Sequence, residues 1–165
     1  MELVLVRHGE AEERLPAFAD ANRALTARGT DRLKKAMRGL PVLLEHPDDV
    51  VVWTSPLLRA TQSARIVADR CGAGEPEVRE FLATGDFAAF ADAYLDVPPT
   101  ACLILVGHEP HLGDWCRRIT GSAPGIGKGD AIGIGVESPA PPAGSLLWKI
   151  DRRTLARLDK RARRR

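Results

Sequence analysis

The sequence lacks any long run of apolar residues. Its longest wholly apolar stretch is residues 101–106, and the run at residues 3–6 is shorter; both are far short of the roughly 20 residues that a helix needs to cross a bilayer. Glu2 follows Met1 directly, without the basic start and apolar stretch of a secretory signal. The sequence therefore predicts a protein without a membrane span, located in the cytoplasm.

Cysteine is also scarce. The three cysteines, Cys71, Cys102 and Cys116, are an odd number, lie far apart and form no CxxC pair. This pattern excludes a disulfide-rich scaffold and gives no sign of structural zinc. We expect reduced, largely buried thiols.

Basic charge is concentrated at the C-terminus. Residues 151–165 hold eight Lys or Arg and two Asp, a net +6, whereas the whole chain carries only +2 and the rest is therefore mildly acidic. A basic tail can attract nucleic acid or anionic lipid, but this one has no aromatic residues for base stacking. We expect residues 152–165 to be a basic, solvated tail, and nucleic acid is not favoured as a partner.

The remaining 151 residues suit one globular domain, since the chain is 44% hydrophobic and 28% charged. Apolar runs at residues 3–6, 50–53 and 101–106 are typical of parallel strands buried on both faces. We expect two later strands, residues 131–136 and 145–150, to extend the sheet in an antiparallel arrangement. The sequence predicts a single-domain α/β fold, a three-layer α/β/α sandwich with a mostly parallel central sheet.

Helical patterns separate these strands. The first begins at Thr26, which can act as N-cap, and Pro41 is expected to end it. The second can be capped by Ser55 with a proline in its first turn. Asp86 can cap a third helix, and Gly121 closes a fourth.

Basic side chains follow the three central strands. Arg7 and His8 come directly after the first strand, Arg59 comes shortly after the second, and His108 follows the third. In an open α/β sheet, ligands bind beyond the carboxyl ends of the strands, so these four side chains should share one rim. A guanidinium matches phosphate oxygens bidentately, and the first turn of a helix favours an anion. The sequence predicts a phosphate pocket.

His8 is the candidate nucleophile, because a neutral imidazole can attack phosphorus and an arginine cannot. Nearby arginine charges favour its neutral form. Arg7, Arg59 and His108 would hold the equatorial oxygens as charge develops in the transition state. This chemistry requires no metal and no other cofactor.

Ordinary roles compete with these assignments. His8 can be a satisfied structural histidine, and Arg59 can form a helix-surface ion pair. A metal site through His108 and His111 is a further alternative, but HxxH is a loose spacing and no carboxylate cluster supports it. The convergence of all four groups favours phosphate chemistry over each of these.

Four ordered blocks carry a family resemblance: RHGEA, NRALTARG, TSPLLRATQSA and LVGHEP. Together they resemble the histidine phosphatase superfamily, the phosphoglycerate-mutase-like group, and in particular its SixA-type phosphohistidine phosphatases, over roughly the whole chain. The resemblance implies a phosphohistidine intermediate on His8, phosphate binding by Arg7, Arg59 and His108, and release by water. The segment GIGKGDAIGIGVES is similar to a Lys-Gly block of the family, and we assign Lys128 no catalytic role.

The general acid is the point where the chain departs from the family pattern. Family members that act on esters place a carboxylate between the second and third central strands, and Glu80 matches that location approximately. An alkoxide leaves poorly without a proton, whereas the imidazole of phosphohistidine needs less help. Glu80 is the candidate general acid, and a surface carboxylate near an edge strand is an equally good interpretation. Helix capping already explains Asp86.

The short segment between the second and third strands bears on the substrate. Only residues 54–100 lie there, which leaves little chain for a lid. We expect an open site and a phosphatase that hydrolyses phosphohistidine on a protein. A small-molecule phosphomonoesterase and a non-catalytic phosphate-binding domain are the alternatives. The sequence gives no oligomeric state.

Overall fold

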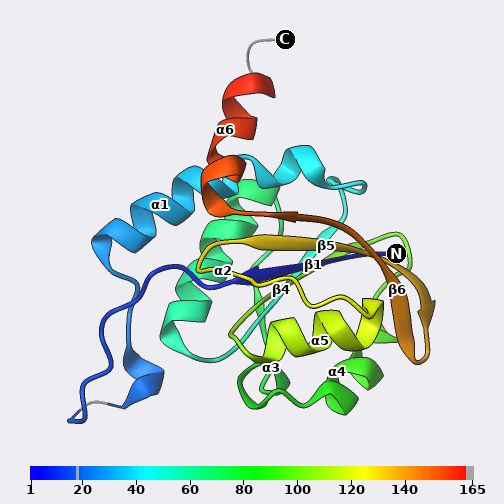
Figure 1. Cartoon of the computed structure of the whole chain (residues 1–165), viewed down its shortest axis with the longest axis horizontal. Coiled ribbons are helices and arrows are strands. Elements are labelled where there is room, and N and C mark those ends of the chain that lie inside the picture. The colour runs from blue at the N-terminus through cyan, green and yellow to red at the C-terminus, as the bar shows by residue number, and fades with distance from the viewer. Residues whose placement is uncertain (18, 163–165) are drawn as a thin grey trace.

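A six-stranded sheet forms the centre of the protein (Figure 1). The computed structural model describes residues 1–17 and 19–162, and side chains as far as residue 158. The strands lie in the order β3-β2-β4-β1-β5-β6. Their bounds are β1 Glu2–Arg7, β2 Val50–Thr54, β3 Glu77–Val78, β4 Cys102–Gly107, β5 Ala131–Pro139 and β6 Pro142–Ile150. The first four are parallel, and β5 and β6 form an antiparallel hairpin beside β1, so the predicted sheet is confirmed.

Helices cover both faces of this sheet, as Figure 1 shows. One layer comprises α1 Ala27–Met37, α2 Leu58–Cys71 and α6 Arg152–Ala162, and the other comprises α3 Phe81–Thr84, α4 Phe87–Tyr94 and α5 His111–Thr120. Short 3-10 helices occur at η1 Asp20–Asn22 and η2 Leu40–Leu43. The three-layer α/β/α arrangement is therefore confirmed.

The central strand β1 explains why its sequence is continuously apolar. Leu3 and Leu5 belong to the core shared with α4 and α5, while Val4 and Val6 belong to the core shared with α1 and α2. All four side chains are fully buried. Because successive side chains point to opposite faces, a strand covered on both sides must be apolar at every position.

Helix ends follow the capping signals with two exceptions. The Thr26 hydroxyl accepts from the Gly29 N–H, and Gly121 ends α5 in the left-handed region. Asp86 likewise caps α4. However, α1 stops at Met37, before Pro41, which lies inside η2.

The start of α2 also differs from prediction. Ser55 does not cap it, because the helix begins at Leu58 with Leu57 as the N-cap residue. The Ser55 hydroxyl is used elsewhere, since it contacts the ring of His108 and accepts from the Leu57 N–H. The Ser55 hydroxyl thus contacts His108, which follows β4, instead of capping α2.

Residues 152–162 are not part of a solvated tail, as their charge had suggested, and residues 163–165 of the predicted tail lie outside the described residues. Residues 152–162 form α6, which packs against α1 (Figure 1). Leu155 is completely buried in the core, and Leu158 packs beside it. The single apolar ridge of a strongly basic helix is enough to dock it on the domain.

The described residues also bear on the cysteines and on membrane-spanning helices. All three cysteines are buried and free, as predicted. Among the described residues, no helix has both the length and the apolarity that crossing a membrane requires.

Candidate active site

The carboxyl ends of β1, β2 and β4 lie side by side. Arg7 pairs with Gly107, and Thr54 pairs with Val106, so the three parallel strands end at one level. His8, Ser55 and His108 are the next residues of each strand, and all three are buried at this edge. The predicted rim is therefore formed by the strand register.

His8 is held by a hydrogen bond on one side of its ring. Its Nδ1 lies 2.7 Å from the carbonyl oxygen of Gly9, and the side chain is largely buried. A carbonyl can only accept, so Nδ1 carries the proton and donates. In the neutral ring Nε2 then keeps a lone pair. The Arg59 Nε–H points at this nitrogen from 3.4 Å.

The surroundings of His8 favour its neutral form. Burial, together with the charges of Arg59, Arg7 and Lys128, lowers the pKa of His8 from 6.5 to about 4, and the Gly9 hydrogen bond opposes this shift. The sequence predicted this direction from the arginines alone. Burial, which the structure adds, is the larger cause.

Arg59 is the most constrained cation of the site. Its side chain is almost buried, and its Nη1 and Nη2 donate to the backbone oxygen and the Oδ2 of Asp20 at 2.9 and 3.0 Å. Arg23 binds the other carboxylate oxygen of Asp20 at 2.8 Å. Desolvation alone would raise the pKa of Asp20, but the hydrogen bonds and charges of Arg59 and Arg23 lower it below its ordinary value. The two terminal nitrogens of Arg59, Nη1 and Nη2, are therefore already bound to Asp20.

His108 faces His8 across the site, with ring centroids 5.1 Å apart. Its Nε2 lies 2.8 Å from the Ser55 hydroxyl oxygen, and its buried Nδ1 has no partner among the described residues. Burial, followed by the charges of His8 and Arg59, lowers the pKa of His108 to about 3. Both rings are therefore neutral at neutral pH, and one ring nitrogen of His108 is available to a ligand.

Arg7 is the last residue of β1 and directly precedes His8. Its Nη1 donates to the backbone oxygen of Ile126 at 3.0 Å, and its buried Nε has no partner among the described residues. The Gly129 N–H bonds the Arg7 carbonyl, and the Arg7 N–H bonds the carbonyl of Asp130. The loop that carries Lys128 is thereby fixed beside β1, which explains why its charge acts on His8.

Two small residues fix the loop after β1. Ser63 accepts from the Gly9 N–H at 3.1 Å and donates to the Arg59 carbonyl at 2.7 Å, so it joins the loop to α2. A Cβ on Gly29 would lie 2.1 Å from the backbone oxygen of Glu10, so α1 can approach the loop only because residue 29 is glycine. These contacts position His8.

Sequence reasoning did not assign functional roles to Asp20 or Ser63. For Ser63 a signal exists, because it lies four residues after Arg59 and so on the same face of a helix. For Asp20 there is none, since it lies in an irregular segment whose path the local sequence does not determine. Figure 1 shows this segment, between β1 and α1, extending away from the body of the domain.

Glu80 lies on the rim but not in the cluster. It follows β3, which runs parallel to β2, and it is the exposed residue just before α3. Within the described chain, its carboxylate makes no hydrogen bond or ion pair with His8, His108 or either site arginine. Its role as general acid stays a prediction.

His108 and His111 gain no third metal ligand in the described part of the chain. There, no three His, Cys, Asp or Glu side chains come together as a group that could hold a metal ion. His111 is half-buried at the start of α5.

Comparison with known proteins identifies the class. Residues 3–94, more than half of the chain, match the profile of the histidine phosphatase superfamily, branch 1. The chain belongs to this superfamily, whose members are phosphatases.

Individual relatives agree with this assignment. The chain is 37% identical to an uncharacterized protein of Picosynechococcus sp. (strain PCC 7002) over 142 residues, 81% of this chain and 84% of the relative. The fold is similar to that of the protein histidine phosphatase SixA complexed with tungstate, with a TM-score of 0.77, 21% identity, and coverage of 94% of this chain and 99% of that one. A mycobacterial glucosyl-3-phosphoglycerate phosphatase gives a TM-score of 0.71 at 13% identity, covering 91% and 99%.

Proposed function

We propose that this protein is a phosphohistidine phosphatase that acts on a phosphorylated protein through a covalent intermediate on His8, without a metal. The observation that carries the proposal is the hydrogen bond from His8 Nδ1 to the Gly9 carbonyl. It leaves the opposite nitrogen, Nε2, unprotonated and directed into a cationic site beside Arg59.

The reaction follows from this geometry in two steps. His8 Nε2 attacks the phosphorus atom, so an N–P bond forms while the bond to the leaving imidazole breaks, and the leaving nitrogen takes a proton. A water molecule then attacks the same phosphorus, the N–P bond breaks, and inorganic phosphate leaves. The neutral form of His8 is regenerated when the water proton goes to phosphate or solvent.

The remaining groups stabilise the phosphoryl oxygens. Arg59 presents its Nε edge toward His8, and Arg7 has a buried Nε–H that is still free within the described chain. When the Ser55 hydroxyl donates to His108 Nε2, the proton of that ring lies on Nδ1, the buried nitrogen that has no described partner. These three donors supply positive charge where negative charge develops, which is the contribution that a metal would otherwise make.

The short segment between β2 and β4 favours a protein substrate. The segment between β2 and β4 consists of α2, β3, α3 and α4, and the last two pack into the core through Leu82, Phe90 and Tyr94. Little of this segment remains to cover the site. The fold likeness to SixA supports phosphohistidine, and the likeness to glucosyl-3-phosphoglycerate phosphatase supports a small phosphoester as the second candidate.

The intermediate gives the decisive experiment. Rapid acid-free quenching during turnover of a phosphohistidine protein should trap acid-labile, base-stable phosphate on the wild type and on His46→Asn, an exposed histidine used as control. His8→Asn should carry none and should release no phosphate. Phosphate release by His8→Asn at the wild-type rate would overturn the mechanism. Binding of phosphate without any turnover by the wild type would identify a non-catalytic domain instead.

Glu80 separates the two substrate classes. In Glu80→Gln, ester hydrolysis should fall steeply while phosphohistidine hydrolysis survives, because only an alkoxide requires protonation on leaving. Asp92→Asn, another exposed carboxylate on the same side of the sheet, is the matched control. Equal losses on both substrates in Glu80→Gln would contradict the assignment of Glu80 as general acid.

A further inference from the structure

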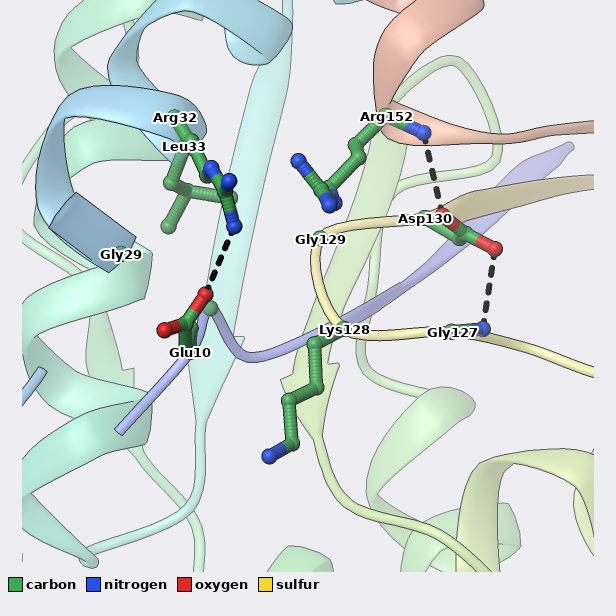
Figure 2. A pocket seen from close by; sticks show the side chains of 10 residues that line it. Glu10, Gly29, Arg32, Leu33, Gly127, Lys128, Gly129, Asp130 and Arg152 are labelled. Carbon is green, nitrogen blue, oxygen red and sulfur yellow. Dashed lines mark hydrogen bonds and ion pairs between the residues drawn. The ribbon is translucent and has the colours of Figure 1, made fainter. Parts of the chain in front are cut away.

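A second pocket lies beside the proposed catalytic site. It has a volume of about 390 Å³, within the roughly 300–1,000 Å³ usual for small-molecule sites. It lies between α1, the loop after β1 and the loop before β5, with α6 at its edge, as Figure 2 shows. Gly9, whose carbonyl holds the nucleophile, forms part of its wall. The pocket therefore adjoins the loop that holds His8.

The acidic residues of this pocket are already neutralised. Asp130 accepts from the backbone N–H groups of Gly127 and Arg152 at 2.9 and 3.0 Å, and it pairs with Lys149 at 3.2 Å. Glu10 pairs with Arg32 across the pocket wall at 2.9 Å. Because both carboxylates already have cationic or N–H partners, this pocket does not favour a cationic ligand.

Two basic side chains of the pocket are uncommitted. Among the described residues, neither the Lys128 amine nor the Arg152 guanidinium makes an ion pair or a hydrogen bond. Figure 2 shows Arg152 reaching from the start of α6 toward Arg32 on α1, with Lys128 on the opposite wall. The charge of Lys128 also acts on His8, so the pocket and the nucleophile share one electrostatic field.

We infer that this pocket binds a second anionic group of the substrate, a carboxylate or phosphate carried next to the phosphoryl group that His8 receives. This inference rests on the proposed function and names a feature of its substrate. A carboxylate matches the guanidinium fork of Arg152 bidentately, while Lys128 acts as a point charge.

Non-hydrolysable ligands test the inference without turnover. Methylphosphonate has one anionic group, and 3-phosphonopropionate adds a carboxylate. Calorimetric titration should show the second binding about tenfold or more tightly, the scale of one charge-assisted contact. Lys128→Ala and Arg152→Gln should each remove most of that preference. Arg153→Gln, which changes the adjacent residue of α6 outside the pocket, should retain it.

The results distinguish the two proposals. Equal affinity of the wild type for both phosphonates would overturn the second anionic site and leave the phosphatase proposal standing. Binding of neither phosphonate, together with no phosphate release from any substrate, would refute the proposed function itself. Lys128 is exposed, and among the described residues its side chain makes no hydrogen bond or ion pair, so Lys128→Ala is expected to keep the fold.

Matched substrates identify where the anionic group comes from. One pair consists of phosphohistidine peptides with Glu or Gln beside the phosphohistidine, and the other of phosphomonoesters with or without a carboxylate. The ratio of kcat/KM within each pair should fall in Arg152→Gln. A preference confined to the peptides assigns the group to a protein side chain, and one confined to the esters assigns it to a small molecule. No preference in either pair would overturn the inference.

Discussion

The buried neutral state of His8 makes a measurable contribution to stability. The pKa of His8 is about 4 in the folded protein, against 6.5 for an unperturbed histidine. Between these values the unfolded chain binds more protons than the folded one, so stability rises with pH there. The contribution is fully present above about pH 6.5 and is lost as pH falls toward 4. Acidification from about pH 7 to about pH 5 should therefore cost about 2 kcal/mol through this residue.

The assay compares variants so that other titrating groups cancel. Urea unfolding at about pH 7 and about pH 5 gives the change in unfolding free energy for wild type and His8→Asn. The wild type should lose about 2 kcal/mol more than His8→Asn, because only the imidazole must be protonated. His46→Asn, in which an exposed imidazole is removed, should behave as the wild type.

One result would refute this reasoning. If His8→Asn loses as much unfolding free energy on acidification as the wild type does, the ring of His8 is not held neutral by burial. Replacing the buried His8 side chain also lowers the unfolding free energy, but this cost is the same at both pH values and therefore cancels in the comparison. The same outcome would also remove the electrostatic argument for a free nucleophile at neutral pH.

Three further predictions concern structure around the site. Ser55→Ala should lower the unfolding free energy by about 1–3 kcal/mol, since the buried Nε2 of His108 loses its described partner; no change in urea midpoint would contradict that contact. Gly29→Ala should destabilise the protein although alanine favours helices, because the new Cβ would lie 2.1 Å from the backbone oxygen of Glu10. Gly74→Ala is the control and should be tolerated, since no atom lies within 4 Å of its Cβ position. Thermal unfolding of the two variants tests this difference in stability. Leu155→Ala should cost about 2–5 kcal/mol and expose α6 to proteolysis, and a change under about 0.5 kcal/mol would mean that the helix is not docked.

Much of the fold could be predicted because its signals are local. The apolar run from Leu3 to Val6 requires a strand covered on both faces, and Thr26 and Asp86 mark helix starts through hydrogen bonds to nearby backbone groups. The fold class depends only on such elements and their order.

The misplaced elements depend on contacts between distant residues. Ser55 was expected as a helix cap, but its hydroxyl contacts a histidine 53 residues later in the chain. Leu155 lies in a strongly basic segment, and its burial depends on the packing of α6 against α1. The two-residue strand β3 is too short for any periodicity to be recognised.

The same distinction applies to the candidate site. Arg7, His8 and His108 could be grouped from sequence because parallel strands end at one edge. Asp20 could not, since its approach to Arg59 spans 39 residues and an irregular segment. The charge of Lys128 acts on His8 because the loop before β5 is bonded to the backbone of Arg7.

The position of β1 at the middle of the sheet has a consequence for evolution and for engineering. This strand is bonded on both edges and covered on both faces, so its amides should be among the last to exchange with solvent. The ring of His8 follows this strand directly and shares its rigidity. Loops around the rim can therefore be lengthened, exchanged or redesigned to accept other phosphorylated molecules while the ring of His8 keeps its position.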